Sequence, residues 1–330
     1  MNCTPPPVGY FESPEFLTHY LHSITAIATV THCFGLWMII FKTPEQMSTV
    51  KWYLFNLQFW IIAFDISVGF LSIPFMLLPR LAGFPLGVAS YFGISTHSQT
   101  IMILHLLGLT LISTIAVFEN RFNALCTFPF QRQWKIWRRP FLLANLIALA
   151  PVTVPCLFMV PEQSEAKKRT YQNLPCLPKY IYEAPVFVLS ENHVYVVASV
   201  VTFVVIIFLE LAFFFAYLLT NTLHQMNSRR ISVRTFQIQR QLVNALIIQS
   251  CLPFTALGLP IGYGCISVLF NYYNQSFMNI AMVTSSLHGI LSTVVMICVH
   301  KPYRKAFIRL VISAKKWYDA KMNVNILQYG

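Results

Sequence analysis

Charged residues are scarce along most of this chain. Only 10% of its 330 residues are charged, whereas 56% are hydrophobic. A water-soluble domain usually has about 25% charged residues, so a soluble globular fold is excluded. Six long runs contain either no Asp, Glu, Lys or Arg or a single acidic residue: 16–41, 52–79, 81–118, 140–161, 192–228 and 241–300. A helix crosses a bilayer with about 20 apolar residues, so we expect an all-α, polytopic membrane protein.

The motifs of several enzyme classes are also absent. The sequence has no phosphate-cradling glycine-rich loop, no His-Glu-x-x-His and no Gly-x-Ser-x-Gly. Of only two Asp residues, Asp319 lies in the tail, which excludes an intramembrane aspartyl protease. Histidines such as His19 and His22 leave a zinc-dependent membrane hydrolase as an alternative, but zinc requires three or four convergent ligands. We therefore expect no enzyme activity, no cofactor and no metal.

Seven membrane-spanning helices are predicted from these runs. A polar segment at 271–276 divides the longest run in two, and Gly83, Pro85 and Gly87 indicate a surface loop before the third helix. The predicted helices are about 18–41, 52–78, 94–118, 141–160, 194–219, 242–269 and 278–299. They form a predicted bundle at 18–299, between an extracellular N-terminus at 1–17 and a cytoplasmic tail at 300–330.

Basic residues are divided unequally between alternate gaps. The gaps 42–51, 121–140 and 220–241, together with the tail, hold 18 of the 23 Lys and Arg residues. Basic loops remain in the cytoplasm, so we expect an outer N-terminus and an inner C-terminus at the plasma membrane. Sequons at Asn2 and Asn274 both fall on the predicted outer side, which is where glycans are added, although such triplets also occur by chance.

The net charge of +12 follows from this topology. Basic residues beside apolar spans contact anionic lipid headgroups, so we expect membrane lipid as a partner and no nucleic acid. In the tail, apolar residues recur at helical spacing from Tyr303 to Trp317, with Lys and Arg between them. This pattern predicts a short amphipathic helix along the inner headgroup layer.

Three acidic residues stand out within or beside the spans. Asp65 lies deep in the second span, where an unpaired acid costs several kcal/mol. It is either an intramembrane switch or ion-binding carboxylate, or an acid hydrogen-bonded to a neighbouring helix for packing. Glu119-Asn120-Arg121 is either an ionic latch between helices or the charged end of the third span. For Glu210 a structural role is favoured.

The outer half holds the remaining candidates. An oxidising exterior favours a disulfide between Cys3 and Cys176, with Cys265 as the alternative partner. Six polar and aromatic residues are candidates for a ligand pocket, although packing explains them equally well: His97, Gln99, Tyr195, Phe254, Tyr263 and Tyr272.

The order and spacing of several short motifs resemble one receptor family. These are Lys51-Trp52-Tyr53-Leu54 followed by Asp65 and Pro74, Glu119-Asn120-Arg121, Ser286-Leu287-His288-Gly289, and His300-Lys301-Pro302-Tyr303-Arg304. Over nearly its whole length the chain is similar to the nematode serpentine chemoreceptors of class H. The resemblance implies a seven-helix G-protein-coupled receptor that detects a small, odorant-like molecule and signals through a heterotrimeric G protein. A sensory cilium is one location compatible with that role.

The same resemblance bears on the coupling residues. Glu119-Asn120-Arg121 looks like a variant of the Asp/Glu-Arg-Tyr triad of rhodopsin-like receptors, with Asn120 at the usual Arg place. The alternative function is a ligand-gated channel or transporter. Seven-helix chemoreceptor channels have the opposite orientation, and the absence of an internal repeat argues against a transporter.

Overall fold

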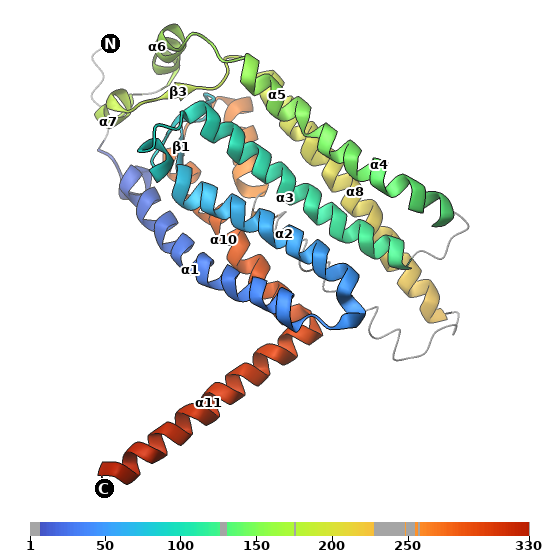
Figure 1. Ribbon diagram of the computed structural model, residues 1–330. Helices are drawn as coiled ribbons and strands as arrows, with labels where there is room; N and C mark the ends of the chain where they lie inside the picture. Colours follow the sequence, from blue (N-terminus) through green and yellow to red (C-terminus); the bar gives the residue numbers. More distant parts are fainter. Residues whose placement is uncertain are drawn as a thin grey trace.

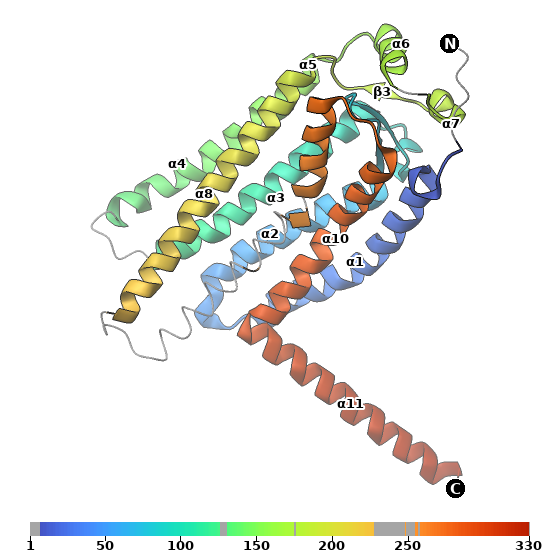
Figure 2. The same cartoon turned by 180° about the vertical axis from the view of Figure 1, so that it is seen from behind.

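The computed structural model describes residues 7–125, 131–174, 176–227, 248, 255–256 and 258–329. Long helices lie side by side in an elongated bundle (Figures 1 and 2). The bundle helices are α1 (Pro14–Lys42), α2 (Ser48–Ile66), α3 (Thr96–Leu125), α4 (Gln131–Ala148), α5 (Ala150–Phe158), α8 (His193–Asn227) and α10 (Gln275–Val299). Within the described residues, six helical spans are long and apolar enough to cross a membrane, because α4 and α5 together form one of them.

A shorter apolar helix, Gly258–Phe270, adds a further member to the bundle. It falls in the predicted span 242–269, much of which lies outside the described residues. The other predicted spans coincide with long helices, but their ends differ. α3 continues to Leu125 and α4 begins at Gln131, so the charged gap expected at 121–140 is largely helical. Lys, Arg and Gln favour helix, and a helix need not end where its apolar part ends.

The second span ends earlier than predicted. After α2 the backbone forms a wider π-helical turn at Ser67–Ser72, and Ile73 then adopts a left-handed φ of 44°. The free carbonyls at this end accept hydrogen bonds from a returning segment: Leu86 N–H donates to Ile73 at 3.0 Å and Gly87 N–H to Ser72 at 2.8 Å. These bonds satisfy groups that a helix terminus leaves unpaired.

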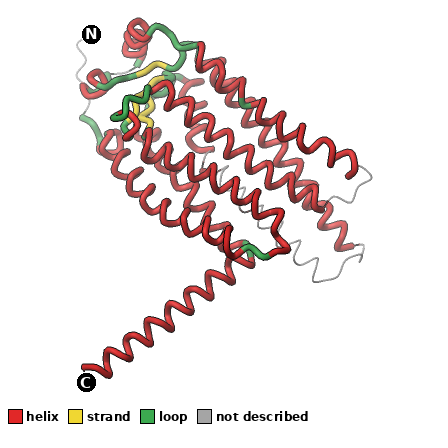
Figure 3. Tube along the Cα trace, viewed as in Figure 1, coloured by secondary structure: helices red, strands yellow, loops and turns green. Residues whose placement is uncertain are grey.

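A small antiparallel sheet replaces the expected helix end and surface loop. Its strands are β1 (Pro74–Met76), β2 (Ala82–Pro85) and β3 (Phe187–Val188), in the order β1-β2-β3. Phe75 pairs with Phe84 and both side chains are buried, so the segment belongs to the packed interior. Figure 3 shows the strands at one end of the bundle, called here the sheet end.

The N-terminal segment and the loop before α8 cover the sheet end. That loop contains α6 (Gln163–Asn173) and α7 (Lys179–Glu183). Tyr180 donates to the backbone carbonyl of Glu12 at 3.2 Å, and Ser276 donates to the Glu12 carboxylate at 3.2 Å. Burial, with Glu12 and Glu15 nearby, raises the pKa of Tyr180 to about 12. The segment before α1 is therefore tied to both α7 and α10.

Two of the three cysteines considered for a disulfide lie within the described residues. Cys176 is disulfide-bonded, whereas Cys265, the alternative partner of Cys3, has a free thiol. Cys3 lies outside the described residues, so its pairing with Cys176 stays a prediction.

The opposite end of the bundle, called here the tail end, is where α11 (Lys301–Tyr329) begins and projects away from the other helices (Figure 1). Its first turn is anchored. Tyr303 is fully buried, and its hydroxyl lies 2.8 Å from the hydroxyl of Thr43 at the end of α1. The Phe307 ring meets Phe34 edge-on at 6.0 Å. The tail helix, predicted from the sequence to be short, is instead 29 residues long and is held by its first turns.

Two apolar cores fill the bundle. A sheet-end core includes Leu17, Phe75 and Ile181, and a tail-end core includes Leu54 and Phe214. Where the surroundings are water, burial of apolar side chains stabilises these cores. Where lipid surrounds the helices, close van der Waals contact between side chains stabilises them.

Gly87 provides a test of how the hairpin packs. A Cβ atom there would collide with the backbone carbonyl of Leu71, which cannot move like a side-chain end. We expect Gly87→Ala to destabilise the receptor by roughly 1–3 kcal/mol, seen as a lower Tm in detergent. Gly262→Ala is the control, because its Cβ would meet nothing within 4 Å. An unchanged Tm for Gly87→Ala would contradict the packing.

Candidate ligand cavity and buried polar clusters

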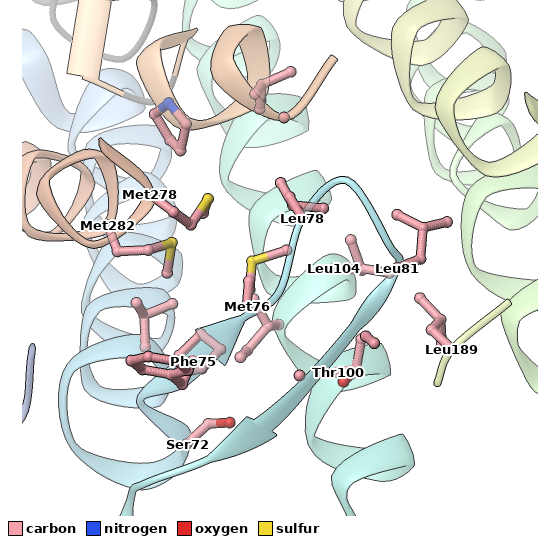
Figure 4. Close-up of a pocket in the computed structure, with 18 of the residues that line it drawn as sticks. Ser72, Phe75, Met76, Leu78, Leu81, Thr100, Leu104, Leu189, Met278 and Met282 are labelled. Atoms are coloured by element: carbon pink, nitrogen blue, oxygen red, sulfur yellow. The ribbon is translucent and has the colours of Figure 1, made fainter. Parts of the chain in front are cut away.

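An apolar cavity of about 280 Å³ lies inside the sheet end of the bundle. Its walls come from α2, α3, α8, α10, the helix Gly258–Phe270 and all three strands. Figure 4 shows Phe75, Met76, Leu78, Met278 and Met282 gathered around it. The π-helical turn and the hairpin place β1 and β2 within the bundle, so the cavity depends on the early end of α2.

The predicted pocket residues lie elsewhere. Of the six, five are described, and none of these five lines the cavity. His97 contacts the Cys156 carbonyl at 2.8 Å, and Gln99 donates to the Ile94 carbonyl at 2.8 Å. Tyr195, Tyr263 and Tyr272 have hydrogen bonds with Pro151, Asn274 and Asn274 respectively. Phe254 lies outside the described residues.

Sequence reasoning missed the residues that do line the cavity. Several of them are the immediate neighbours of predicted ones, such as Thr96 beside His97 and Val196 beside Tyr195. The sequence prediction favoured polar and aromatic side chains, whereas aliphatic side chains predominate in the wall. The available signal was the pair of short apolar runs around Pro79 and Gly83, which is typical of a hairpin.

A buried polar layer separates the two cores. Asp65 on α2 lies 3.0 Å from His32 Nε2 on α1, and both are at most 4% exposed. The Gln58 amide donates to Thr293 Oγ1 at 2.9 Å and lies 3.0 Å from His32 Nδ1. A histidine that donates from Nε2 to Asp65 and accepts at Nδ1 from Gln58 satisfies these contacts. The layer therefore joins α1, α2 and α10.

Small residues allow this layer to form. A Cβ on Gly289 would collide with the Asp65 carboxylate and come within 3.0 Å of the His32 ring. On the same helix His288 is fully buried, and neither ring nitrogen has a hydrogen-bond partner among the described residues. Asp65 Oδ1 is likewise unpartnered there. The helices approach so closely because α10 has no side chain at Gly289.

A second ionic cluster occupies the tail end of α3. Glu119 has no exposed side-chain area, and its Oε2 lies 2.9 Å from Arg138 Nη2 of α4. Its other oxygen accepts a hydrogen bond from Trp134 Nε1 at 3.0 Å, and Arg138 also donates to the Tyr53 hydroxyl at 3.1 Å. The acid thus forms a connection between helices, but with Arg138 and not with Arg121. The cluster joins α2, α3 and α4.

Arg121 faces a different set of residues. It is 8% exposed, and its Nε and Nη2 find no hydrogen-bond partner in the described part of the chain. Tyr303 and His300, at the junction of α10 and α11, are its electrostatic neighbours. Asn120 is also buried. The three motif residues therefore lie inside the packed bundle instead of at a solvated helix end.

Burial and the positive charge of Arg121 lower the pKa of His300 to about 4. The ring is 2% exposed and packs edge-on against Tyr303 at 5.6 Å. It is therefore neutral near pH 7, and protonation would place a second positive charge beside Arg121.

Of the other candidate residues, Glu210 and Asn274 have hydrogen-bond partners in the structure. Asn145 donates to Glu210 at 3.4 Å, which fits the structural role expected for that acid. Asn274 caps α10 by accepting from Phe277 N–H at 3.0 Å. Asn2 lies outside the described residues. Among the described residues, no group of three or more His, Cys, Asp or Glu is arranged to hold a metal ion.

The Glu119–Arg138 pair is testable by removing one partner. We expect Arg138→Leu to cost about 3 kcal/mol of stability, because it leaves a buried carboxylate unpaired. Adding Glu119→Gln should recover most of that loss, since the amide oxygen still accepts from Trp134. Thermal unfolding in detergent is the measurement, with the exposed Arg139→Leu as control. A double variant no more stable than Arg138→Leu would contradict the pairing.

His300 predicts an acid-sensitive part of the stability. An unfolded histidine has a pKa near 6.5, so the unfolded state binds the proton more readily than the folded state. The stability linked to His300 is full above that value and is lost as the pH falls toward about 4. We expect the Tm to fall more steeply between pH 7 and pH 5 in the wild type than in His300→Phe. Parallel Tm profiles would rule this contribution out.

Comparisons with known proteins agree with this architecture. The model of the family described as serpentine type 7TM GPCR chemoreceptor Srh matches residues 12–313. Serpentine receptor class H-72 of Caenorhabditis elegans is 24% identical over 318 residues, covering 94% of this chain and 90% of the relative. The crystal structure of squid rhodopsin superposes with a TM-score of 0.52 at 8% identity, covering 95% of this chain and 92% of that one.

The likeness to rhodopsin shows the fold, a multi-pass bundle of the seven-transmembrane type, and confirms the predicted fold class. The family match spans most of the chain and confirms the resemblance found in the sequence. The protein belongs to the Srh family of serpentine seven-transmembrane chemoreceptors.

Proposed function

We propose that this receptor binds a small molecule in the sheet-end cavity and transmits the event to a heterotrimeric G protein at the tail end. The sheet end would face the exterior and the tail end the cytoplasm, in the plasma membrane. The observation that carries the proposal is the cavity itself. It lies at the sheet end of the bundle, opposite the end that holds most of the basic residues.

The charge distribution supports this orientation. The segments at the tail end, including α4 before Pro140 and α11, are rich in Lys and Arg. Positive residues favour the cytoplasmic side. On that side the exposed apolar and basic residues of α11 would contact an anionic inner leaflet, as the sequence predicts.

The path between the two ends runs along α3. Thr100 and Leu104 of α3 line the cavity, and Glu119 and Arg121 lie further along the same helix. A ligand that prefers one position of α3 shifts the balance between two arrangements of the bundle. Asp65, in the polar layer beside α3, would act as the intramembrane switch, and Glu119, Asn120 and Arg121 would control the tail end.

Nucleotide exchange tests this proposal. Receptor in lipid nanodiscs, mixed with candidate G proteins and a panel of small volatile molecules, should accelerate exchange when an activating molecule is present. Arg121→Ala should reduce the stimulated rate at least about fivefold, within the usual range of coupling between sites. The exposed Lys135→Ala, on α4, is the control and should leave the rate unchanged.

Surface labelling accompanies the exchange assay. On sealed cells an antibody should reach a tag at the N-terminus, whereas a tag at the C-terminus should need permeabilisation. A C-terminal tag accessible on sealed cells, or a complete panel without any stimulated exchange, would overturn the proposal.

A further inference from the structure

We infer that the cavity selects an uncharged, mainly hydrocarbon ligand of about 10–15 non-hydrogen atoms and rejects ions of the same size. This inference rests on the proposed function, because it concerns the chemistry of the ligand for that site.

The wall of the cavity has few polar side chains. None of the described lining residues is charged, and none has an amide or imidazole side chain. The side-chain polar groups are the hydroxyls of four residues and one thiol: Ser72, Thr96, Thr100, Ser285 and Cys265. The Thr100 hydroxyl already donates to the Thr96 carbonyl at 2.9 Å. Among these described residues a ligand would therefore find few free donors and no counter-ion.

Burying an ionised carboxylate or ammonium without a partner costs far more free energy than burying an unpaired neutral polar group. Each 1.4 kcal/mol lowers affinity tenfold, so a single charge suffices to exclude a ligand that otherwise fits. A ketone or ether oxygen costs less, and one of the wall hydroxyls is able to donate to it.

The volume of the cavity limits the size of the ligand. An apolar cavity of about 150 Å³ accommodates benzene, which has six carbon atoms. The cavity here, at about 280 Å³, is nearly twice as large. A molecule with about 10–15 non-hydrogen atoms therefore fits.

The wall is also adaptable in shape. Met76, Met278 and Met282 approach the cavity from β1 and α10 (Figure 4). Methionine is unbranched and fills irregular gaps, and surfaces rich in it bind several related molecules. We therefore expect the cavity to discriminate more strongly between neutral and charged ligands than between hydrocarbons of different shape.

The free thiol of Cys265 provides a reporter at the wall. Cys33 and Cys298 are also free and do not line the cavity, so they serve as internal controls. Purified receptor in nanodiscs is treated with N-ethylmaleimide, and alkylation of each cysteine is followed by mass spectrometry. Three probes of similar length are compared at equal concentration: methyl heptyl ketone, nonanoate and nonylammonium.

Methyl heptyl ketone should slow alkylation of Cys265 at least about tenfold and leave Cys33 and Cys298 unchanged. The two ions should change the rate at Cys265 less than about twofold. Equal protection by nonanoate or nonylammonium would overturn the inference, as would the absence of protection by both the ketone and a second neutral probe, butylbenzene.

A matched glycine pair tests the location. Gly264 lines the cavity, and a Cβ there meets only Leu78 at 3.5 Å, whereas Gly262 on the same helix has open space around it. Gly264→Leu should reduce the ketone bound per receptor, corrected for empty nanodiscs, at least tenfold. Gly262→Leu should bind like the wild type. Equal binding by both variants would place the ketone outside the cavity and overturn the inference.

These results separate the inference from the proposed function. If the ketone protects Cys265 but no neutral molecule stimulates nucleotide exchange, signalling through a G protein fails and the ligand class stands. If exchange responds to a charged molecule that also protects Cys265, the ligand class fails and the signalling role stands.

Discussion

The contact between His32 and Asp65 is the constraint on which the bundle depends. An acid at this depth is unfavourable unless another helix supplies a partner, because neither lipid nor an apolar core solvates it. His32 supplies that partner from α1 at 3.0 Å, and Gln58 and Thr293 extend the network to α10. The register of three helices is thereby fixed by hydrogen bonds, which are directional, and not only by apolar packing, which tolerates sliding.

The close approach of α10 is part of the same constraint. Gly289 leaves room for the Asp65 carboxylate, and Gly35 on α1 leaves room for Thr293. Larger residues at either position would separate the helices and lengthen the hydrogen bonds of the layer. Polar groups and small residues therefore act together, as is typical where lipid provides no hydrophobic force between helices. Once the layer is formed, the sheet-end and tail-end cores pack on either side of it.

The sequence predicted Asp65 but not its partner, for a physical reason. A carboxylate is conspicuous in an apolar run because it is almost never left there unpaired, whereas nine histidines are spread along the chain and nothing in the sequence distinguishes His32 from the others. Its pairing with a residue 33 positions away depends on how α1 and α2 cross, which a single sequence does not specify. Glu119 is a similar case, because the sequence identified it as a candidate but did not identify its partner Arg138.

The fold class was predictable for a different reason. Spans follow from the absence of charge over about 20 residues, a property of the chain that needs no tertiary information. The ends of spans are less predictable, since α4 begins in a basic segment that favours helix. The hairpin was missed because its strands are only three and four residues long, and its pairing with β3 joins segments about a hundred residues apart. Short strands have too little pattern for periodicity to reveal them.

The two ends of the bundle differ in the kind of interaction that holds them. At the sheet end, the cavity is bounded by aliphatic, aromatic and methionine side chains, which rearrange at low cost. At the tail end, Glu119 accepts hydrogen bonds from Trp134 and Arg138 of α4, and Arg138 also donates to Tyr53 of α2. Such a buried network has few alternative geometries. The cavity and the Glu119 network are joined by the rigid helix α3. Side chains around the cavity adjust at low cost, whereas the Glu119 network changes only when its groups exchange hydrogen-bond partners. This difference suits a receptor. Packed helices then tend to move between discrete arrangements instead of deforming continuously. Arg121 lies two residues from Glu119 on α3, and its Nε and Nη2 have no hydrogen-bond partner among the described residues, so an arrangement that supplied such partners would be stabilised.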